Sequence, residues 1–284
     1  MPHWGCELVK SACRYHGAKW MLAPWIIDHL PPHQVFVEAF AGSAAVLLRK
    51  PRSYAEVMND LDDGVVNLFR VLRDPAQAAA LREAITLTPF SRVEFDLARD
   101  MSTDLDAVEF ARRFLVRSFQ GHSSASVHKS TGFRSNSNRS GSTPAQDWAR
   151  WPDRVTALVE RLRGVVIEQR DFEPVLRSHD AAATVSYIDP PYVSSTRDAG
   201  TDYFHEFTDA DHVRLAGVLH DLTGMVVLSG YQSEIYADLF GDWQRVDRPA
   251  LADGARPRLE SLWLNPAASD ALARARGGQI EMFG

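Results

Sequence analysis

Short apolar runs alternate with helical stretches along this chain, and this alternation limits the fold more than any other feature of the sequence. Strands are predicted at residues 35–40, 55–60, 165–168, 184–188 and 225–229, with a further pair at 243–246 and 259–264. Helical periodicity appears between them, as in the stretch 209–222, where Thr208 and Asp211 match a capping box. Because strands that alternate with helices are typical of a mostly parallel sheet, the sequence predicts an α/β protein.

The strand pattern is interrupted between residues 62 and 151. Helices are predicted there over 64–73, 76–85, 91–100 and 107–119. A segment rich in Ser, Asn, Arg and Gly follows from 121 to 144, and a loop of this length is usually functional or disordered. We therefore expect residues 1–62 and 151–284 to form one α/β domain, with residues 63–150 inserted as a helical unit.

Composition limits the classes of function. Of the 284 residues, 45% are apolar and 24% are charged, and no apolar run reaches transmembrane length. The amino terminus lacks the layout of a signal peptide, and Cys6 and Cys13 are too few for a disulfide framework or a thiolate zinc site. We therefore expect a cytoplasmic protein that has no membrane partner.

Charge is unevenly distributed. The net charge is −6, yet no Asp or Glu occurs between Ala111 and Gln146. The basic residues of that segment are Arg112, Arg113, Arg117, Lys129, Arg134 and Arg139. An acidic body with one basic segment is typical of a nucleic-acid binder with a separate reading element. A solvated helix followed by a loop is the alternative that composition leaves open.

The tetrad Asp189-Pro190-Pro191-Tyr192 directly follows the predicted strand at 184–188. Proline cannot donate to a sheet ladder, so the strand must end there. The carboxylate then lies at the carboxyl end of a buried strand, which is the sheet edge where α/β proteins bind ligands. Acceptors beside an aromatic ring suit an amino group on a flat base. A turn with a helix-capping Asp is the alternative.

A second candidate site lies near the start of the chain. The strand at 35–40 leads into the small residues Ala41-Gly42-Ser43-Ala44-Ala45, which open a helix and leave room for a nucleotide. A complete G-x-G-x-x-G is missing. Asp60 ends the next strand, where an acid meets ribose hydroxyls, although it could equally cap the helix at 64–73. Together these features suggest a ligand that contains adenosine.

Five motifs in this order resemble those of the Dam-type DNA adenine-N6 methyltransferases, especially the phage and prophage members. They are Tyr15-His16-Gly17-Ala18-Lys19, the stretch 36–43, Asn59-Asp60, Asp171-Phe172 and Asp189-Pro190-Pro191-Tyr192; Tyr203, Phe207 and Ser229-Gly230-Tyr231 also fall where the family has similar residues. The resemblance implies a Rossmann-like methyltransferase sheet, mostly parallel with one antiparallel strand near the C-terminus, and an inserted helical domain.

The resemblance also implies S-adenosyl-L-methionine as the cofactor. The residues that would contact it are Tyr15, Lys19, Glu38, Phe40, Gly42, Ser43, Asp60, Asp171, Phe172 and Asp189. For three of them a structural role is the alternative: Tyr15 and Phe172 as core aromatics, and Lys19 as a solvated charge.

Asp189, Pro190 and Tyr192 are the catalytic residues that the resemblance implies. The exocyclic amine of adenine is a poor nucleophile because its lone pair is delocalised into the ring. The Asp189 carboxylate and the Pro190 carbonyl would accept its two N–H groups and localise that pair, while Tyr192 stacks on the base. The base would be flipped out of the duplex, and no metal is expected because the leaving thioether is neutral.

The helical insertion occupies the position of the family's target-recognition domain, which would bind double-stranded DNA of a defined sequence. The candidate DNA contacts are Arg117, Lys129, Arg134, Asn136, Asn138 and Arg139. Residues 277–284 are predicted to be a flexible tail. Gln279, Ile280, Met282 and Phe283 resemble the short motifs that dock bacterial proteins on the replication sliding clamp, with a frayed terminus as the alternative. A monomer in solution is expected.

Three alanines depart from the family pattern. Ala18 and Ala44 stand where glycine is common, and Ala39 stands where proline is usual. An added methyl group where the backbone approaches a ligand can weaken binding. Two alternatives therefore stay open: an enzyme that methylates cytosine N4 or an amide nitrogen, and a catalytically silent DNA-binding homologue.

Overall fold

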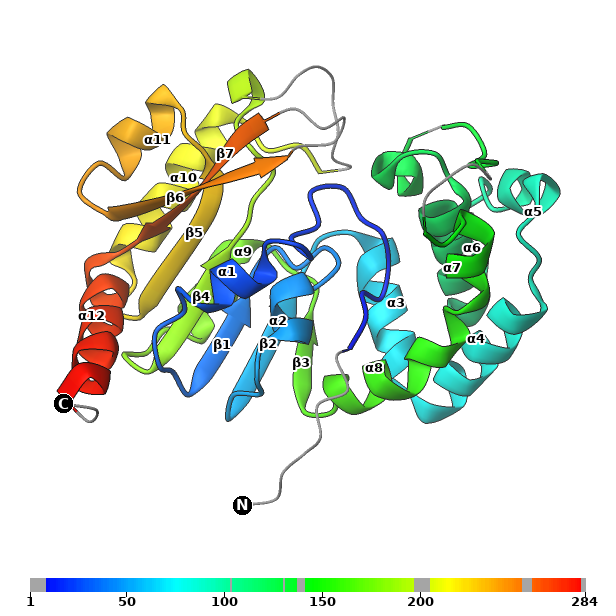
Figure 1. Cartoon of the computed structure of the whole chain (residues 1–284), viewed down its shortest axis with the longest axis horizontal. Coiled ribbons are helices and arrows are strands. Elements are labelled where there is room, and N and C mark those ends of the chain that lie inside the picture. Colours follow the sequence, from blue (N-terminus) through cyan, green and yellow to red (C-terminus); the bar gives the residue numbers. More distant parts are fainter. Residues whose placement is uncertain are drawn as a thin grey trace.

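A seven-stranded sheet in the order β3-β2-β1-β4-β5-β7-β6 forms the centre of the protein (Figure 1). The computed structural model describes residues 9–102, 104–129, 131–136, 141–196, 205–251 and 257–281. The strands are β1 Val35–Glu38, β2 Ala55–Asn59, β3 Val165–Glu168, β4 Thr184–Ile188, β5 Met225–Tyr231, β6 Gln244–Leu251 and β7 Pro257–Leu264. β1 to β5 are parallel, and β7 is antiparallel to both of its neighbours. The predicted Rossmann-like sheet with one antiparallel strand is therefore confirmed.

Helices cover both faces of the sheet. Alternate residues of β1, β2, β4, β5 and β7 enter two hydrophobic clusters, as Phe36 and Val37 of β1 do. The first face carries α1 Ala23–Ile27, α2 Ala45–Arg49, α8 Val155–Leu162 and α12 Pro266–Glu281, and the second carries α9 Phe172–Ser178, α10 Asp209–Asp221 and α11 Glu234–Leu239 (Figure 1). Because both faces are covered, β4 is buried at every position.

The strand order changes direction between β1 and β4. The chain proceeds from β1 to β2 and β3 on one side, then crosses to β4 and β5 on the other. The carboxyl ends of β1 and β4 therefore diverge at a switch point, where α/β sheets bind ligands. The predicted strands at 35–40 and 55–60 end earlier, at Glu38 and Asn59, so Phe40 and Asp60 belong to the loops above this edge.

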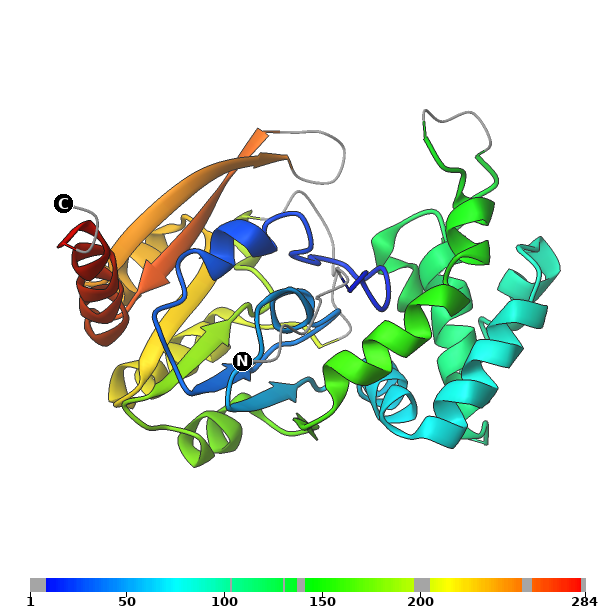
Figure 2. The same ribbon diagram turned by 60° about the horizontal axis from the view of Figure 1, so that its bottom comes forward.

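The interrupted region is helical, as predicted, and lies at the β3 end of the sheet (Figures 1 and 2). Its helices are α3 Asp63–Arg73, α4 Pro75–Leu87, α5 Arg92–Leu97, α6 Ala107–Gln120 and α7 Pro144–Ala149, with 3-10 turns η1 Ser124–Val127 and η2 Pro152–Arg154. The capping box at Thr143 and Gln146 starts α7. Between α6 and α7 the described residues contain η1 and one isolated bridge, Gly121 to Phe133.

The C-terminal region differs from the prediction. α12 continues through Gly277 and Gly278 to Glu281, so the segment predicted as a tail begins as helix, and its flexibility stays a prediction. The helix-forming run Ala271-Leu272-Ala273-Arg274-Ala275-Arg276 precedes the glycines, and extending an existing helix costs far less than starting one. Residues 282–284 lie outside the described residues. None of the described helices is long and apolar enough to span a bilayer.

Candidate active site

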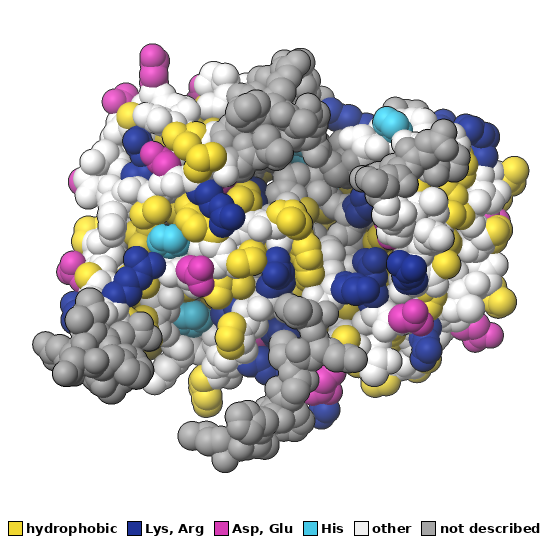
Figure 3. Space-filling view, viewed as in Figure 1, with side chains coloured by type: hydrophobic (Ala, Val, Ile, Leu, Met, Phe, Trp, Pro, Cys, Tyr) yellow, Lys and Arg dark blue, Asp and Glu magenta, His cyan; other side chains and the backbone are white. Residues whose placement is uncertain are grey.

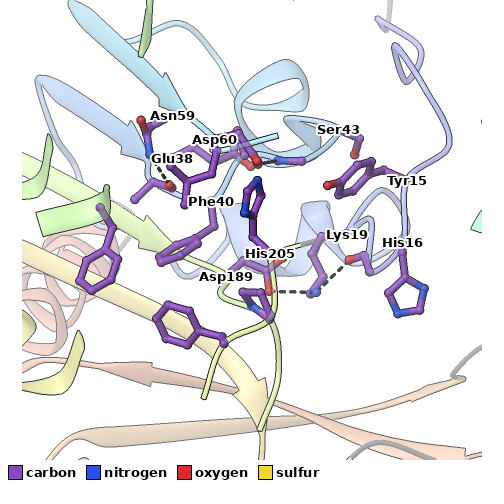
Figure 4. A pocket seen from close by; sticks show the side chains of 18 of the residues that line it. Tyr15, His16, Lys19, Glu38, Phe40, Ser43, Asn59, Asp60, Asp189 and His205 are labelled. Atoms are coloured by element: carbon purple, nitrogen blue, oxygen red, sulfur yellow. Dashed lines mark hydrogen bonds and ion pairs between the residues drawn. The ribbon is translucent and has the colours of Figure 1, made fainter. Parts of the chain in front are cut away.

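A cavity of about 450 Å³ opens above the carboxyl ends of β1, β2 and β4. Its walls come from six parts of the chain: residues 15–19, the loop 38–45, residues 59–61, residues 170–172, residues 189–191 and residues 205–214. Figure 4 shows Glu38, Asp60, Asp189 and Lys19 around this space. The structure thus gathers all five sequence motifs at one site.

The loop after β1 is built from small residues because its backbone bends sharply beside the cavity. Gly42 has φ +48°, and a Cβ there would lie 3.0 Å from Cδ1 of Tyr15. Its amide donates to Asp60 Oδ2 at 2.7 Å. The Ser43 hydroxyl is buried, lines the cavity and has no hydrogen-bond partner among the described residues. This loop therefore presents an unused polar atom to a ligand.

Two acids lie beneath this loop. Glu38 is only 2% exposed and accepts the Leu47 amide at 2.9 Å, while burial raises its pKa to about 8. Asp60 accepts the amides of Gly42 and Asp62, and burial raises its pKa to about 6. The alternative that Asp60 caps α3 is wrong, because Asp62 caps that helix by accepting the Gly64 amide at 2.8 Å.

Asp189 is held by Lys19 at the end of β4. Lys19 Nζ lies 2.9 Å from Asp189 Oδ1 and donates to the Gly17 carbonyl at 2.9 Å (Figure 4). Burial raises the pKa of Asp189 to about 6, although the Lys19 ammonium offsets part of that rise. Lys19 is itself 6% exposed, so the alternative of a solvated charge is wrong.

Tyr192 is packed behind Asp189 and lies outside the described lining of the cavity. Its hydroxyl donates to Glu260 and lies 3.3 Å from Ser229 Oγ. Lys19 Nζ lies over its ring, 4.6 Å from the centroid, and the Tyr231 ring meets it edge-on at 4.6 Å. Stacking of Tyr192 on a base, as the sequence suggests, would therefore require these neighbours to move. Pro191, not Tyr192, reaches the cavity.

An aromatic wall closes another side. The rings of Phe40, Phe172 and Phe207 lie 5.6–5.9 Å apart. Arg214 stacks over Phe172 at 4.2 Å and binds both carboxylate oxygens of Asp171, at 3.0 and 2.8 Å. That hydrogen-bonded pair holds the pKa of Asp171 below its usual value. Phe172 is thus both a core aromatic, as the alternative has it, and part of the cavity wall.

Tyr15 connects the cavity to the helical region. Its hydroxyl donates to Asp62 Oδ2 at 2.7 Å, and His128 Nε2 lies 2.5 Å from the same oxygen. Burial works to raise the pKa of Asp62, but the bonds from His128 and Tyr15 hold it below its usual value. Tyr15 is therefore a lining residue with a hydrogen-bonding role, not only a core aromatic.

The described residues among the predicted DNA contacts do not line the cavity. Arg117 is half-buried, and its Nε donates to the Ser126 carbonyl at 3.1 Å, so it fixes η1. Lys129, Arg134 and Asn136 follow on the same segment, and of these described residues none lines the cavity. Asn138, Arg139 and Tyr203 lie outside the described residues. Figure 3 shows Lys and Arg side chains on the helical end of this face and near its middle.

Several site residues were not singled out from the sequence. They are His16, Asp62, His205, Arg214 and Glu260. Glu260 had a detectable signal, because it is the one acid in the apolar strand 259–264. His16 lies within the first motif and Asp62 lies two residues after Asp60. His205 and Arg214 lie further from the motifs along the sequence, which hides their proximity in space.

The three departing alanines occupy different settings. Ala18 is exposed at the rim, and Ala39 is buried, with its carbonyl accepting Asn59 Nδ2 at 3.0 Å. Ala44 precedes α2 with a left-handed backbone, φ 50°, where glycine is favoured.

A family model described as D12 class N6 adenine-specific DNA methyltransferase matches residues 15–248. This range covers every motif around the cavity and the whole helical region. A comparison with curated proteins finds no match.

Proposed function

The chain belongs to the D12 class of N6 adenine-specific DNA methyltransferases, and we propose that Asp189 and the Pro190 carbonyl bind the adenine amine that receives the methyl group. The methyl donor of such an enzyme is S-adenosyl-L-methionine. The class is adenine-specific, so it favours adenine N6 over cytosine N4 and over a silent homologue. The narrower Dam-type and phage assignment stays a prediction.

The residues of the cavity fit this cofactor. Gly42 and Ser43 line the cavity, and the buried Ser43 hydroxyl has no hydrogen-bond partner among the described residues. The carboxylates of Asp60 and Asp189 outnumber the Lys19 ammonium around the floor, which favours a cationic ligand. Glu38 adds little negative charge at neutral pH, because its pKa is raised to about 8. Bound S-adenosyl-L-methionine supplies an electrophilic methyl group on such a cation, a sulfonium.

We assign the remaining cofactor contacts by position. The loop residues Phe40, Gly42 and Ser43, with Asp60, would hold the ribose and methionine parts. The aromatic wall would hold the adenine, with Phe172 against the ring and Asp171 at the rim. The full proposed set is Tyr15, Lys19, Glu38, Phe40, Gly42, Ser43, Asp60, Asp171, Phe172 and Asp189.

Asp189 would act as an acceptor, not as a base that removes a proton before attack. An ionised carboxylate and a carbonyl that accept the two N–H groups draw the nitrogen toward a tetrahedral geometry and localise its lone pair. The protein then contributes orientation and fixed dipoles. Because Asp189 must be ionised, and its pKa is raised to about 6, turnover should fall as the pH drops through about 6.

The observation that carries this proposal is the placement of Asp189 at the cavity by Lys19, 2.9 Å away. Asp189→Ala should lower methyl transfer by a factor on the order of 10²–10³ or more, and leave DNA affinity within a few fold. Mass spectrometry of digested DNA identifies N6-methyladenine and excludes N4-methylcytosine.

Asp153→Ala, which removes an exposed acid outside the cavity, is the matched control and should keep wild-type turnover. Normal turnover in Asp189→Ala would refute the acceptor role. Absence of N6-methyladenine with the wild-type enzyme would refute the function itself.

The helical region would read the DNA. Its basic, acid-free segment supports this proposal, with Arg117, Lys129, Arg134, Asn136, Asn138 and Arg139 as the candidate contacts. The target adenine would enter the cavity by flipping out of the duplex. A monomeric enzyme, and clamp docking through Gln279 and its neighbours, remain predictions.

A further inference from the structure

Glu260 is a buried acid that lies outside the sequence motifs of the site. It stands on β7 opposite Tyr231 of β5 and Arg248 of β6, and it is 3% exposed. Its neighbours in alternate positions, Leu262 and Leu264, are fully buried apolar residues. Burying a carboxylate among apolar side chains costs free energy unless the carboxylate is well paired. The partners of Glu260 therefore indicate its role.

Its partners come from three separate parts of the active site. One oxygen, Oε1, accepts the Tyr192 hydroxyl and lies 3.3 Å from Ser229 Oγ. The same oxygen lies 3.9 Å from Lys19 Nζ. Glu260 therefore joins the turn after β4, the strand β5 and the N-terminal segment.

Lys19 is shared between two carboxylates. Its ammonium is 2.9 Å from Asp189 Oδ1 and 3.9 Å from Glu260 Oε1, and it lies over the Tyr192 ring at 4.6 Å. The second carboxylate draws on the same positive charge, so Asp189 is only partly neutralised. The Glu260 carboxylate also keeps the Lys19 ammonium from shifting towards Asp189.

We propose that Glu260 is a positioning residue for methyl transfer. It fixes the Lys19 ammonium and the Tyr192 hydroxyl so that Asp189 keeps its place and its strength as an acceptor for the adenine amine. This inference rests on the proposed role of Asp189.

The other ionisable groups around Asp189 are Lys19 from the N-terminal segment, Glu38 from β1, Tyr187 from β4, Tyr192 from the following turn and Tyr236 from α11. Burial raises the pKa of Asp189 most, Lys19 lowers it, and Glu260 raises it. Removing the charge of Glu260 should therefore lower the pKa of Asp189.

Glu260→Gln tests this, because it keeps the size of the side chain and removes its charge. We expect kcat to fall about tenfold to a hundredfold, with little change in KM for DNA or for S-adenosyl-L-methionine. We also expect the acidic limb of the profile of kcat against pH to move to lower pH, because the pKa of Asp189 falls. Glu260→Asp keeps the charge but withdraws it by one methylene, so it should lower kcat less and leave the limb closer to that of the wild type.

Glu56→Gln is the matched control. Glu56 is also 3% exposed on a strand and is paired with Lys50 and Arg161, away from the cavity. It should lose stability without moving the acidic limb. Circular dichroism and thermal melts establish that each variant is folded.

A wild-type kcat in folded Glu260→Gln would overturn the inference. So would a lower kcat in that variant if the acidic limb of its pH–kcat profile stayed in place, as is expected for Glu56→Gln. If Glu260→Gln does not fold, wild-type kcat in Glu260→Asp would overturn it. In each case a strong loss in Asp189→Ala would leave the proposed function standing.

Discussion

Gly42 and Ala44 both adopt left-handed backbone in one short loop, with φ +48° and φ 50°. At Gly42 the conformation brings the backbone against the Tyr15 ring, so a side chain would meet strain and a close contact together. At Ala44 the methyl group is fully buried, and its burial offsets part of the strain. The same conformation therefore has different consequences two residues apart.

Gly42→Ala should lower the free energy of unfolding by about 1–2 kcal/mol from left-handed strain alone. The contact with Tyr15 should add to this loss and weaken cofactor binding. Chemical denaturation and titration calorimetry with S-adenosyl-L-methionine measure the two effects.

Ala44→Gly is the paired variant. Removing the left-handed strain should stabilise the fold by about 1–2 kcal/mol. The loss of the buried methyl group should cost about 0.8 kcal/mol, and the greater freedom of the unfolded chain about 0.4–1 kcal/mol more. The free energy of unfolding should therefore stay within about 1 kcal/mol of wild type. Equal losses in both variants would contradict the difference between the two sites.

The placement of residues at the cavity was predictable where it follows from a local motif. Asp189 and Asp60 reach the cavity because each follows a parallel strand, and parallel strands end at one edge. The orientation of Tyr192 was not predictable, because it depends on Glu260, 68 residues further along the chain. The spacing of residues along the sequence does not indicate a buried hydrogen bond between residues so far apart.

At the scale of elements, the N-terminal segment is held by the helical region although its residues 9–22 contain no helix or strand. Trp151, which is fully buried, donates its indole N–H to the Ala12 carbonyl at 2.8 Å. Ser118 on α6 bonds both the amide and the carbonyl of Arg14, each at 2.8 Å. These bonds position the segment that carries Tyr15 and Lys19.

Trp151→Phe should lower the free energy of unfolding by about 2–4 kcal/mol, because it leaves the Ala12 carbonyl unpaired and underfills the core. It should also weaken S-adenosyl-L-methionine binding several-fold, since Tyr15 and Lys19 lose their support. Denaturant titration and calorimetry give the two values.

Trp243→Phe is the control for this prediction, because Trp243 is buried in the other cluster, against Phe240 and His220 of α10. It should cost stability and spare cofactor affinity. Unchanged cofactor affinity in Trp151→Phe would show that the segment does not depend on this bond.

The helices of the interrupted region were predictable from apolar periodicity and from their caps, as Asp62 and Asp106 show. The continuation of α12 was not, because glycine lowers helix propensity but does not forbid helix once a preceding turn exists. The strands β6 and β7 also extend beyond the predicted ranges, to Leu251 and from Pro257. Proline is tolerated there because β6 is an edge strand and Pro257 starts β7.

At the scale of the whole molecule, one hydrophobic cluster crosses the predicted boundary between sheet and helical insertion. Leu68 and Phe69 of α3 belong to the same cluster as Phe36, Met58 and Tyr187 of the sheet. Sequence could locate the change from strands to helices, but not the shared core, since burial depends on which faces meet. The boundary at residues 62 and 151 therefore stays a prediction about function.

Because the core is shared, the sheet and the helical region should unfold together. Thermal unfolding followed by far-ultraviolet circular dichroism and by tryptophan fluorescence should give coincident transitions, with a calorimetric enthalpy close to the van't Hoff value. Tryptophans report on both parts, Trp148 and Trp151 at the helical end and Trp243 and Trp263 at the sheet. S-adenosyl-L-methionine should raise the single midpoint, since it binds only the folded state.

A fragment of residues 63–150 should show no cooperative transition, because the apolar face of α3 would be exposed. Two separate transitions, or a folded fragment, would instead establish the helical region as an independent domain.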